Sequence, residues 1–203
     1  MENSEYSERI EKFKLENTEI LLRMMCDTGG ASLMISMFLK DLKEKNRFGV
    51  AFMPVPGEML GSSRLKDQIV EVLPHVFKQL IQNDNELLAI SFSSEAWVRT
   101  KELSDEEKTE FKDTSDPDVS KIEYEHLPKK EALIITYEGE GFCDIDMKYI
   151  HREGKMINSE NKLVDCIRLE DKMYEKTDPK DLTYKGRFMG LYELYLKTKK
   201  EMS

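Results

Sequence analysis

Two runs of alternating apolar and polar residues, separated by only three residues, restrict the fold most strongly. The first run is EALIITYE at 131–138, and the second is FCDIDMKYIHR at 142–152. Alternation with a period of two is typical of a β-strand that turns one face toward a core. Because only Gly139-Glu140-Gly141 joins the runs, they must form an antiparallel hairpin, in which Gly141 supplies a left-handed loop residue.

The apolar pattern also predicts the register of this hairpin. A three-residue loop pairs Ile135 with Ile145 and gathers the apolar partners on one face. A two-residue loop would pair Ile135 with Asp144, because a slip of one residue sends every side chain to the other face. We therefore expect Ile135 and Ile145 on the core side of the sheet, and Asp144 and Asp146 on the polar side.

A third strand is predicted by ELLAISFSSEAWVRT at 86–100, where the period of two continues for about a dozen residues. Unbroken alternation places Trp97, the only tryptophan, on the polar face with Glu95 and Arg99. A β-bulge near Ser93 would instead return Trp97 to the core. Since an indole is largely apolar, we expect Trp97 to be partly covered, and Trp97, Glu95 and Arg99 are candidate binding residues.

The remaining elements follow from helical spacing and from chain breakers. A fourth strand is expected after Gly154, as Lys155–Asn158, as Leu163–Leu169, or as both. The apolar segment 47–63 contains prolines and glycines, so we expect it to be irregular. Apolar residues at three- and four-residue spacing predict helices over 4–25, 31–45, 64–82 and 186–202.

This order of elements predicts an α+β fold with an antiparallel sheet of about four strands, a meander, and helices packed on one face. We expect a single domain over 1–203, with a mainly helical half at 1–82. The sheet would occupy 86–170 and carry an acidic insertion at 102–130, and the helix at 186–202 would close the chain.

The negative charge of the chain is concentrated in one place. Residues 102–131 hold eleven acids and five bases, which accounts for −6 of the net charge of −9. Such a long insertion is either a lid or a mobile loop, and the sequence leaves both open. Because duplex binding needs a concentrated basic face, a nucleic acid partner is not expected.

The composition favours a cytoplasmic protein without a cofactor. No stretch approaches the roughly 20 apolar residues that span a bilayer, and the first residues do not resemble a secretory signal. The three cysteines are far apart, which does not suggest a disulfide framework. Dinucleotide and phosphate-loop motifs are absent from the sequence, so no cofactor is expected.

The polar sheet face offers the main candidate for chemistry. On it we expect Glu138, Asp144, Asp146 and Lys148, and such carboxylates could bind a divalent metal next to an activating lysine. Acidic-x-Lys patterns also arise by chance in a chain with 40 acids, and antiparallel sheets often leave one face in water. We therefore assign no metal ligands, and a metal-dependent hydrolase or nuclease is an alternative.

With the strands placed, SFSSEAWV followed by EALIITYE resembles a family of uncharacterised phage and prophage proteins. In that family a strand that ends in Glu-Ala-Trp precedes a second apolar strand, and the terminal GRFMGLYE is also similar. The resemblance covers about residues 64–195. It implies an intracellular accessory protein of a mobile element and brings no activity with it.

The sequence therefore favours a non-enzymatic binding or accessory protein over an enzyme. Its partner would be an unidentified protein or a second copy of the chain, and no membrane is expected. A further alternative is a homodimeric structural module that buries Trp97 between subunits.

Overall fold

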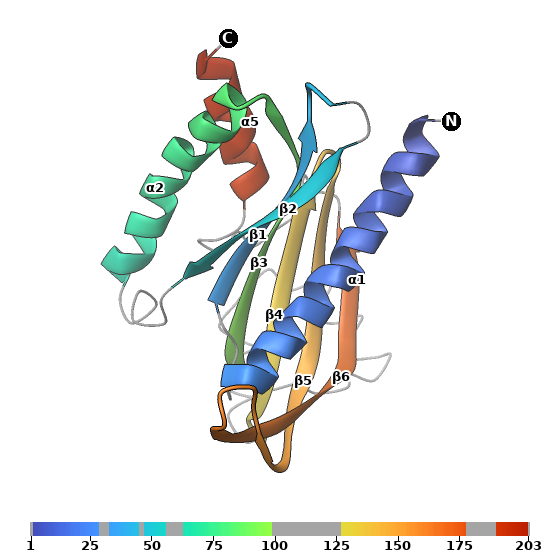
Figure 1. Cartoon of the computed structure of the whole chain (residues 1–203), viewed down its shortest axis with the longest axis vertical. Coiled ribbons are helices and arrows are strands. Elements are labelled where there is room, and N and C mark those ends of the chain that lie inside the picture. Colours follow the sequence, from blue (N-terminus) through green and yellow to red (C-terminus); the bar gives the residue numbers. More distant parts are fainter. Residues whose placement is uncertain are drawn as a thin grey trace, which may run out of the picture.

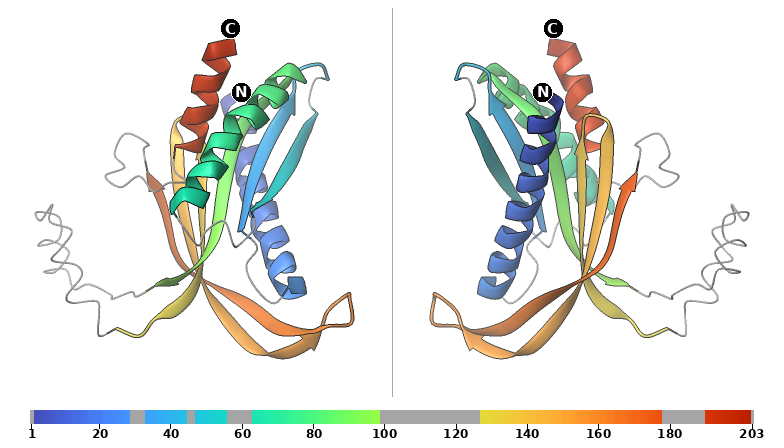
Figure 2. Two further views of the ribbon diagram at one scale, coloured as in Figure 1. Left: turned by 90° about the vertical axis from the view of Figure 1, so that its left-hand side faces the viewer. Right: turned by 90° about the vertical axis from the view of Figure 1, so that its right-hand side faces the viewer.

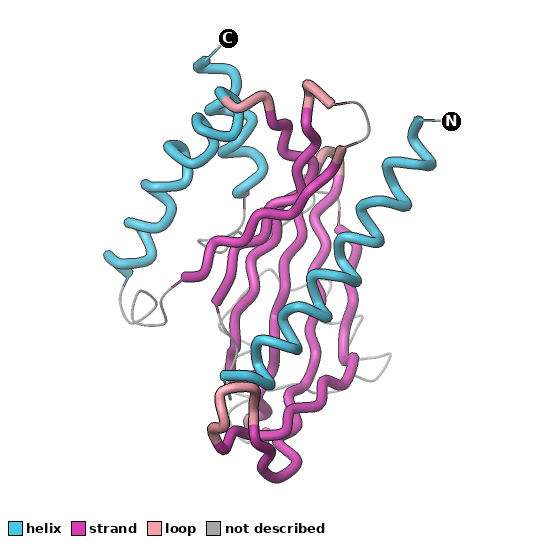
Figure 3. The backbone as a smooth tube through the Cα atoms, viewed as in Figure 1, coloured by secondary structure: helices cyan, strands magenta, loops and turns pink. Residues whose placement is uncertain are grey.

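The chain folds around a six-stranded antiparallel sheet that is strongly curved (Figures 1 and 3). The computed structural model describes residues 2–28, 33–44, 47–55, 63–98, 127–177 and 190–202. The strands are β1 (Leu33–Asp41), β2 (Phe48–Val55), β3 (Asn85–Val98), β4 (Lys130–Gly139), β5 (Phe142–Ile157) and β6 (Leu163–Thr177). The helices are α1 (Glu2–Thr28), α2 (Ser63–Gln82) and α5 (Leu191–Met202).

The strands lie in the order β2-β1-β3-β4-β5-β6, and every neighbouring pair is antiparallel. Only the step from β2 to β3 departs from a simple meander, since α2 connects these strands and β3 pairs with β1. The predicted α+β class is confirmed. The sheet has six strands, however, and not about four.

Helices cover both faces of the sheet, so the prediction of helices on one face is wrong. Figure 2 shows α2 and α5 in front of the strands in one view and α1 in front in the opposite view. The side chains of β1 divide accordingly. Ile35 and Met37 join the core beneath α2 and α5, whereas Met34 and Phe38 join the core beneath α1. Alternate residues of a strand point to opposite faces of the sheet. Because helices cover both faces of β1, both sets of its side chains are apolar.

The residues of β1 are those for which we predicted a helix over 31–45, and that prediction is wrong. The run LMISMFL is apolar at nearly every position, so it fits a helix and a buried strand equally well. All of Leu33–Leu39 is buried, as expected for a strand between two neighbours with helices above and below.

The segment expected to be irregular, 47–63, contains strand β2 and the start of α2. We predicted no strand here partly because of Pro54, since a proline cannot donate a hydrogen bond to a neighbouring strand. It is tolerated here because β2 is an edge strand of the sheet.

The other predicted helices are confirmed within the described residues. Helix α1 is continuous from Glu2 to Thr28 and includes the whole predicted range 4–25. Helix α2 contains Pro74, and α5 begins at Leu191.

The hairpin of β4 and β5 has a different register from the predicted one. Its loop is Glu140-Gly141, with Gly141 at φ +75°, and it pairs Ile135 with Asp146. Ile135 therefore shares its face with Asp144 and Asp146, and α1 packs on that face. The aspartates can lie there because α1 supplies a buried cation, as described below. Our prediction that Asp144 and Asp146 lie away from the helices is wrong.

Strand β3 keeps the alternation that places Trp97 beside Glu95. Its pairing with β4 runs without interruption from Ala89 to Val98. The irregularity of β3 lies at Leu88, where the register against β1 shifts, and not near Ser93. Trp97 is 65% exposed, opposite Glu131 of β4.

Both proposals for a fourth strand describe part of one long hairpin. Lys155–Ile157 completes β5, and Leu163–Leu169 begins β6. Its tip bonds to the end of α1, where Asn158 Nδ2 donates to the Asp27 carbonyl at 2.6 Å. Residues 99–126, which include Arg99 and most of the acidic insertion, lie outside the described residues. The two alternatives for the insertion, a lid and a mobile loop, therefore stay predictions.

Candidate functional site

A buried ion pair joins α1 to the middle of the sheet. Lys14 Nζ lies 2.5 Å from Asp144 Oδ2, and the two side chains are only 9% and 4% exposed. Lys14 also donates to Glu11 Oε1 at 2.9 Å, on the solvent side of the helix. Removal of two charges from water costs several kcal/mol per ion, so each charge depends on its partner. This pair fixes the face on which the sheet presents its aspartates.

Next to this pair, Tyr137 connects β4 to the backbone of α1. Its hydroxyl donates to the Lys14 carbonyl at 3.2 Å and lies 3.2 Å from Thr18 Oγ1. Burial raises the pKa of Tyr137, although the hydrogen bonds from Thr18 and Asn17 partly oppose this effect. The phenol therefore stays protonated at neutral pH and acts as a fixed hydrogen-bond donor at the base of the site.

Beyond Tyr137, one lysine lies between two carboxylates. Lys148 Nζ is 3.1 Å from Asp146 Oδ2 and also bonds to Asp171 of β6. Burial raises the pKa of Asp146, while Lys148 partly counteracts it. Burial disfavours the charged form of Lys148, but hydrogen bonding to Asp171 and attraction to Asp146 outweigh it and raise the pKa of the ammonium. Two carboxylates thus share a single ammonium.

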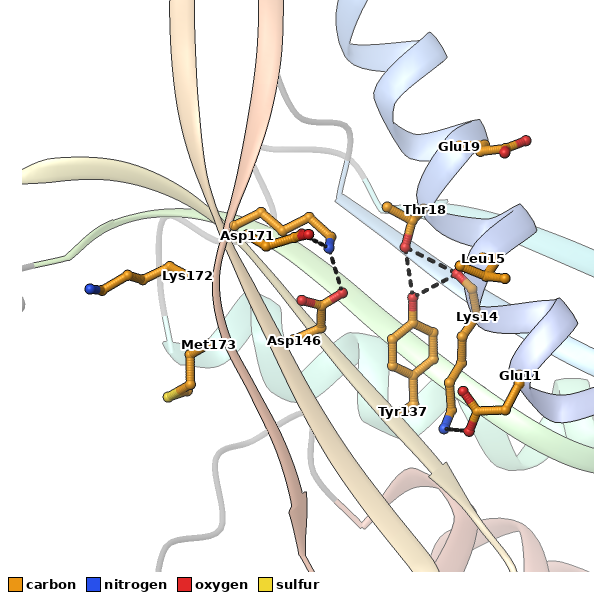
Figure 4. Close-up of a pocket in the computed structure, with 11 residues that line it drawn as sticks. Glu11, Lys14, Leu15, Thr18, Glu19, Tyr137, Asp146, Asp171, Lys172 and Met173 are labelled. Carbon is orange, nitrogen blue, oxygen red and sulfur yellow. Dashed lines mark hydrogen bonds and ion pairs between the residues drawn. The ribbon is translucent and has the colours of Figure 1, made fainter. Parts of the chain in front are cut away.

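These groups lie in a cleft of about 480 Å³ between α1 and the β5–β6 hairpin. Figure 4 shows the side chains of α1 on one side, those of the hairpin on the other, and Tyr137 between them. Leu15 adds exposed apolar surface at 69%, whereas Met173 pairs with Met147 and therefore points to the opposite face of the hairpin from Asp146. The charged residues of the lining are four acids and three lysines (Glu11, Glu19, Asp146, Asp171, Lys14, Lys148 and Lys172).

Glu138 does not belong to this cleft, although we expected it beside the aspartates. It pairs with Cys143 and therefore points to the face beneath α5. There its carboxylate accepts hydrogen bonds from the N–H groups of Gly190 at 2.8 Å and Tyr192 at 2.9 Å. Burial raises the pKa of Glu138, while those N–H groups partly oppose the increase. Its role is to cap α5, as acidic groups do at helix N-termini.

The four residues proposed for a metal-dependent hydrolase are thus divided between the two faces of the sheet. Asp144, Asp146 and Lys148 lie beneath α1, and Glu138 lies on the opposite face. Within the described residues, no group of three or more His, Cys, Asp or Glu side chains could hold a metal ion.

Glu95, which we predicted beside Trp97, belongs to a separate polar network around Arg152. Arg152 binds Glu95 at 3.1 Å, Glu131 at 2.5 Å and Asp165 at 3.2 Å. Hydrogen bonding to Arg152 lowers the pKa of Glu131 against the opposing effect of burial. Glu95 is therefore engaged within the sheet, and Trp97 is the more accessible of the two predicted residues that the structure describes.

Of the residues in the cleft, we predicted Asp146 and Lys148 from the sequence but not those that α1 contributes. A signal was present, since Lys14 and Asn17 interrupt the apolar stripe of Ile10, Phe13 and Leu21. Polar residues on the buried stripe of a helix usually have polar partners on the surface opposite. Asn17 indeed donates to Ser91 Oγ at 3.1 Å.

Comparison with known proteins gives no relative. No family model, no curated protein sequence and no solved structure matches the chain. The resemblance to phage proteins thus stays a prediction. Among the described helices, none combines the length and the apolar character that a bilayer crossing requires.

Proposed function

We propose that this chain is a non-enzymatic binding protein, and that its ligand occupies the cleft between α1 and the β5–β6 hairpin. The observation that carries the proposal is the Asp146–Lys148–Asp171 arrangement, in which one ammonium serves two carboxylates. The arrangement lies in a cleft large enough for a side chain or a small organic molecule.

The excess of negative charge favours a ligand that carries a cation. Asp146 is buried, and a second ammonium or guanidinium group beside it would compensate the charge that Lys148 leaves unmatched. Leu15 borders the same cleft and could pack against an aliphatic stem. These features together favour a lysine-like or arginine-like side chain, as part of a peptide or protein partner.

An accessory role of this kind agrees with the predicted membership of a phage or other mobile element, which is also part of the proposal. The alternative of a metal-dependent hydrolase has less support, because Glu138 caps α5 on the opposite face of the sheet.

The test compares two probes that differ in one ammonium group. Nα-acetyl-lysine methylamide carries the ammonium, and the norleucine derivative has nearly the same stem without it. We expect the lysine probe to shift the methyl NMR signals of Leu15 in a saturable manner, and the norleucine probe to cause a much smaller shift. Assignment follows from the loss of those signals in Leu15→Ala. Equal shifts with both probes, or no shift with either, would contradict the proposal.

A further inference from the structure

The two edges of the sheet differ in charge, and this difference points to an interface. Strand β6, one edge, contains the charged run RLEDK at 168–172. Strand β2, the other edge, reads FGVAFMPV and carries no charged residue. Charges on an edge strand prevent pairing with another chain, and an apolar edge lacks this protection. The β2 edge is thus the one suited to pairing.

The backbone of β2 shows which of its groups point away from the sheet. Asp41 N–H donates to the Arg47 carbonyl at 3.0 Å, which identifies this pair as a hydrogen-bonded one. Bonded and non-bonded pairs alternate along an antiparallel ladder, and the register between β1 and β2 has no shift. Gly49 and Ala51 therefore bond to β1. Phe48, Val50 and Phe52 direct their N–H and C=O groups outward, where the described residues provide no neighbouring strand.

From this pattern of outward backbone groups we propose that two copies of the chain pair through β2, with Val50 opposite Val50 of the second copy. Phe48 of each copy then lies opposite Phe52 of the other copy. This register sets the three outward N–H groups of each copy against outward carbonyls of the other. Pro54 also points outward but has no N–H, and it falls beyond the paired region. The outward face of β2 is thus complementary to itself under a two-fold axis.

The side chains of β2 agree with this arrangement. Phe52 is 41% exposed, while Phe48 stacks on Phe38 and carries the Arg9 guanidinium 4.1 Å from its ring centroid. In the dimer, Phe52 would meet Phe48 of the other copy, and cross-strand aromatic pairs stabilise antiparallel strands. On the opposite face, a Cβ atom added to Gly49 would meet nothing within 4 Å, so this position leaves room for the second copy.

Sedimentation equilibrium over a series of concentrations tests the dimer. We expect the wild-type chain to approach twice its monomer mass. Val50→Pro should raise the dimer dissociation constant at least about tenfold, because it removes an outward N–H and leaves the bonds to β1 intact. Phe52→Lys should have the same effect by placing charge on the edge. The matched control is Leu163→Lys, which adds the same charge at a 69% exposed position of β6 and should leave the dimer unchanged.

Circular dichroism confirms that each variant is folded before its mass is interpreted. A wild-type chain that stays monomeric at every concentration would overturn the proposal. A dimer that persists in both Val50→Pro and Phe52→Lys would also overturn it. Slower amide exchange at Phe48, Val50 and Phe52 in concentrated than in dilute samples is the expected direct sign of pairing.

Discussion

Substitution of either partner of the Lys14–Asp144 pair should destabilise the protein, but to different extents. In Lys14→Met, the Asp144 carboxylate remains 4% exposed and loses the ammonium that lies 2.5 Å away. The loss of one partner of a buried pair typically costs about 3–5 kcal/mol. In Asp144→Asn, the ammonium keeps Glu11 at 2.9 Å and an amide oxygen where the carboxylate was. We expect a cost of about 1–3 kcal/mol for this variant.

The assay is urea unfolding at neutral pH, followed by circular dichroism and extrapolated to water. The double variant Lys14→Met/Asp144→Asn should cost less than the sum of the single variants, since residues in direct contact couple by about 0.5–3 kcal/mol. Equal effects of the two single variants would refute this reasoning. So would additive effects, or a cost below about 1 kcal/mol for Lys14→Met.

Three other predictions follow from the burial and the contacts of single residues. Ile135→Ala should cost about 2–5 kcal/mol in the same urea assay because Ile135 is completely buried, whereas Leu15→Ala, at a 69% exposed position, should change stability by less than about 0.5 kcal/mol. The lowered pKa of Glu131 contributes stability that is present above the pKa of the unfolded chain and is lost as the pH falls through the folded value. The stability difference between wild type and Glu131→Gln should therefore be constant above about pH 5 and shrink below it, and a difference that grows on acidification would contradict this assignment. Trp97 should emit at long wavelength and be readily quenched by acrylamide, and a blue-shifted, protected emission would show that its 65% exposed surface is covered in solution.

The sequence predicted the elements best where one period was clear. The alternation in β3, β4 and β5 and the apolar stripes of α1 and α2 each fit a single structure. The run LMISMFL fitted both a helix and a strand, because a strand buried on both faces has no polar residue to mark its period. The choice between helix and strand for these residues depends on α1 and α2, which lie elsewhere in the chain.

The candidate site was predicted only in part for the same physical reason. We assumed that one sheet face is polar and wet, so the register was chosen to keep Asp144 away from the core. The structure places Asp144 in the core, because Lys14 of α1 neutralises it there. A pattern within one hairpin cannot reveal a partner more than a hundred residues earlier. The lysine on the apolar stripe of α1 was the one local indication of such a partner.

The most direct test of the proposed binding function is the affinity of the cleft for Nα-acetyl-lysine methylamide in three proteins. The wild type and Glu170→Gln should bind the probe alike, because Glu170 points to the opposite face of β6 from Asp171. Asp146→Asn should weaken binding at least about tenfold, since it removes the buried carboxylate while changing the net charge by the same amount as the control. Equal affinity in all three proteins would contradict a cation site in the cleft.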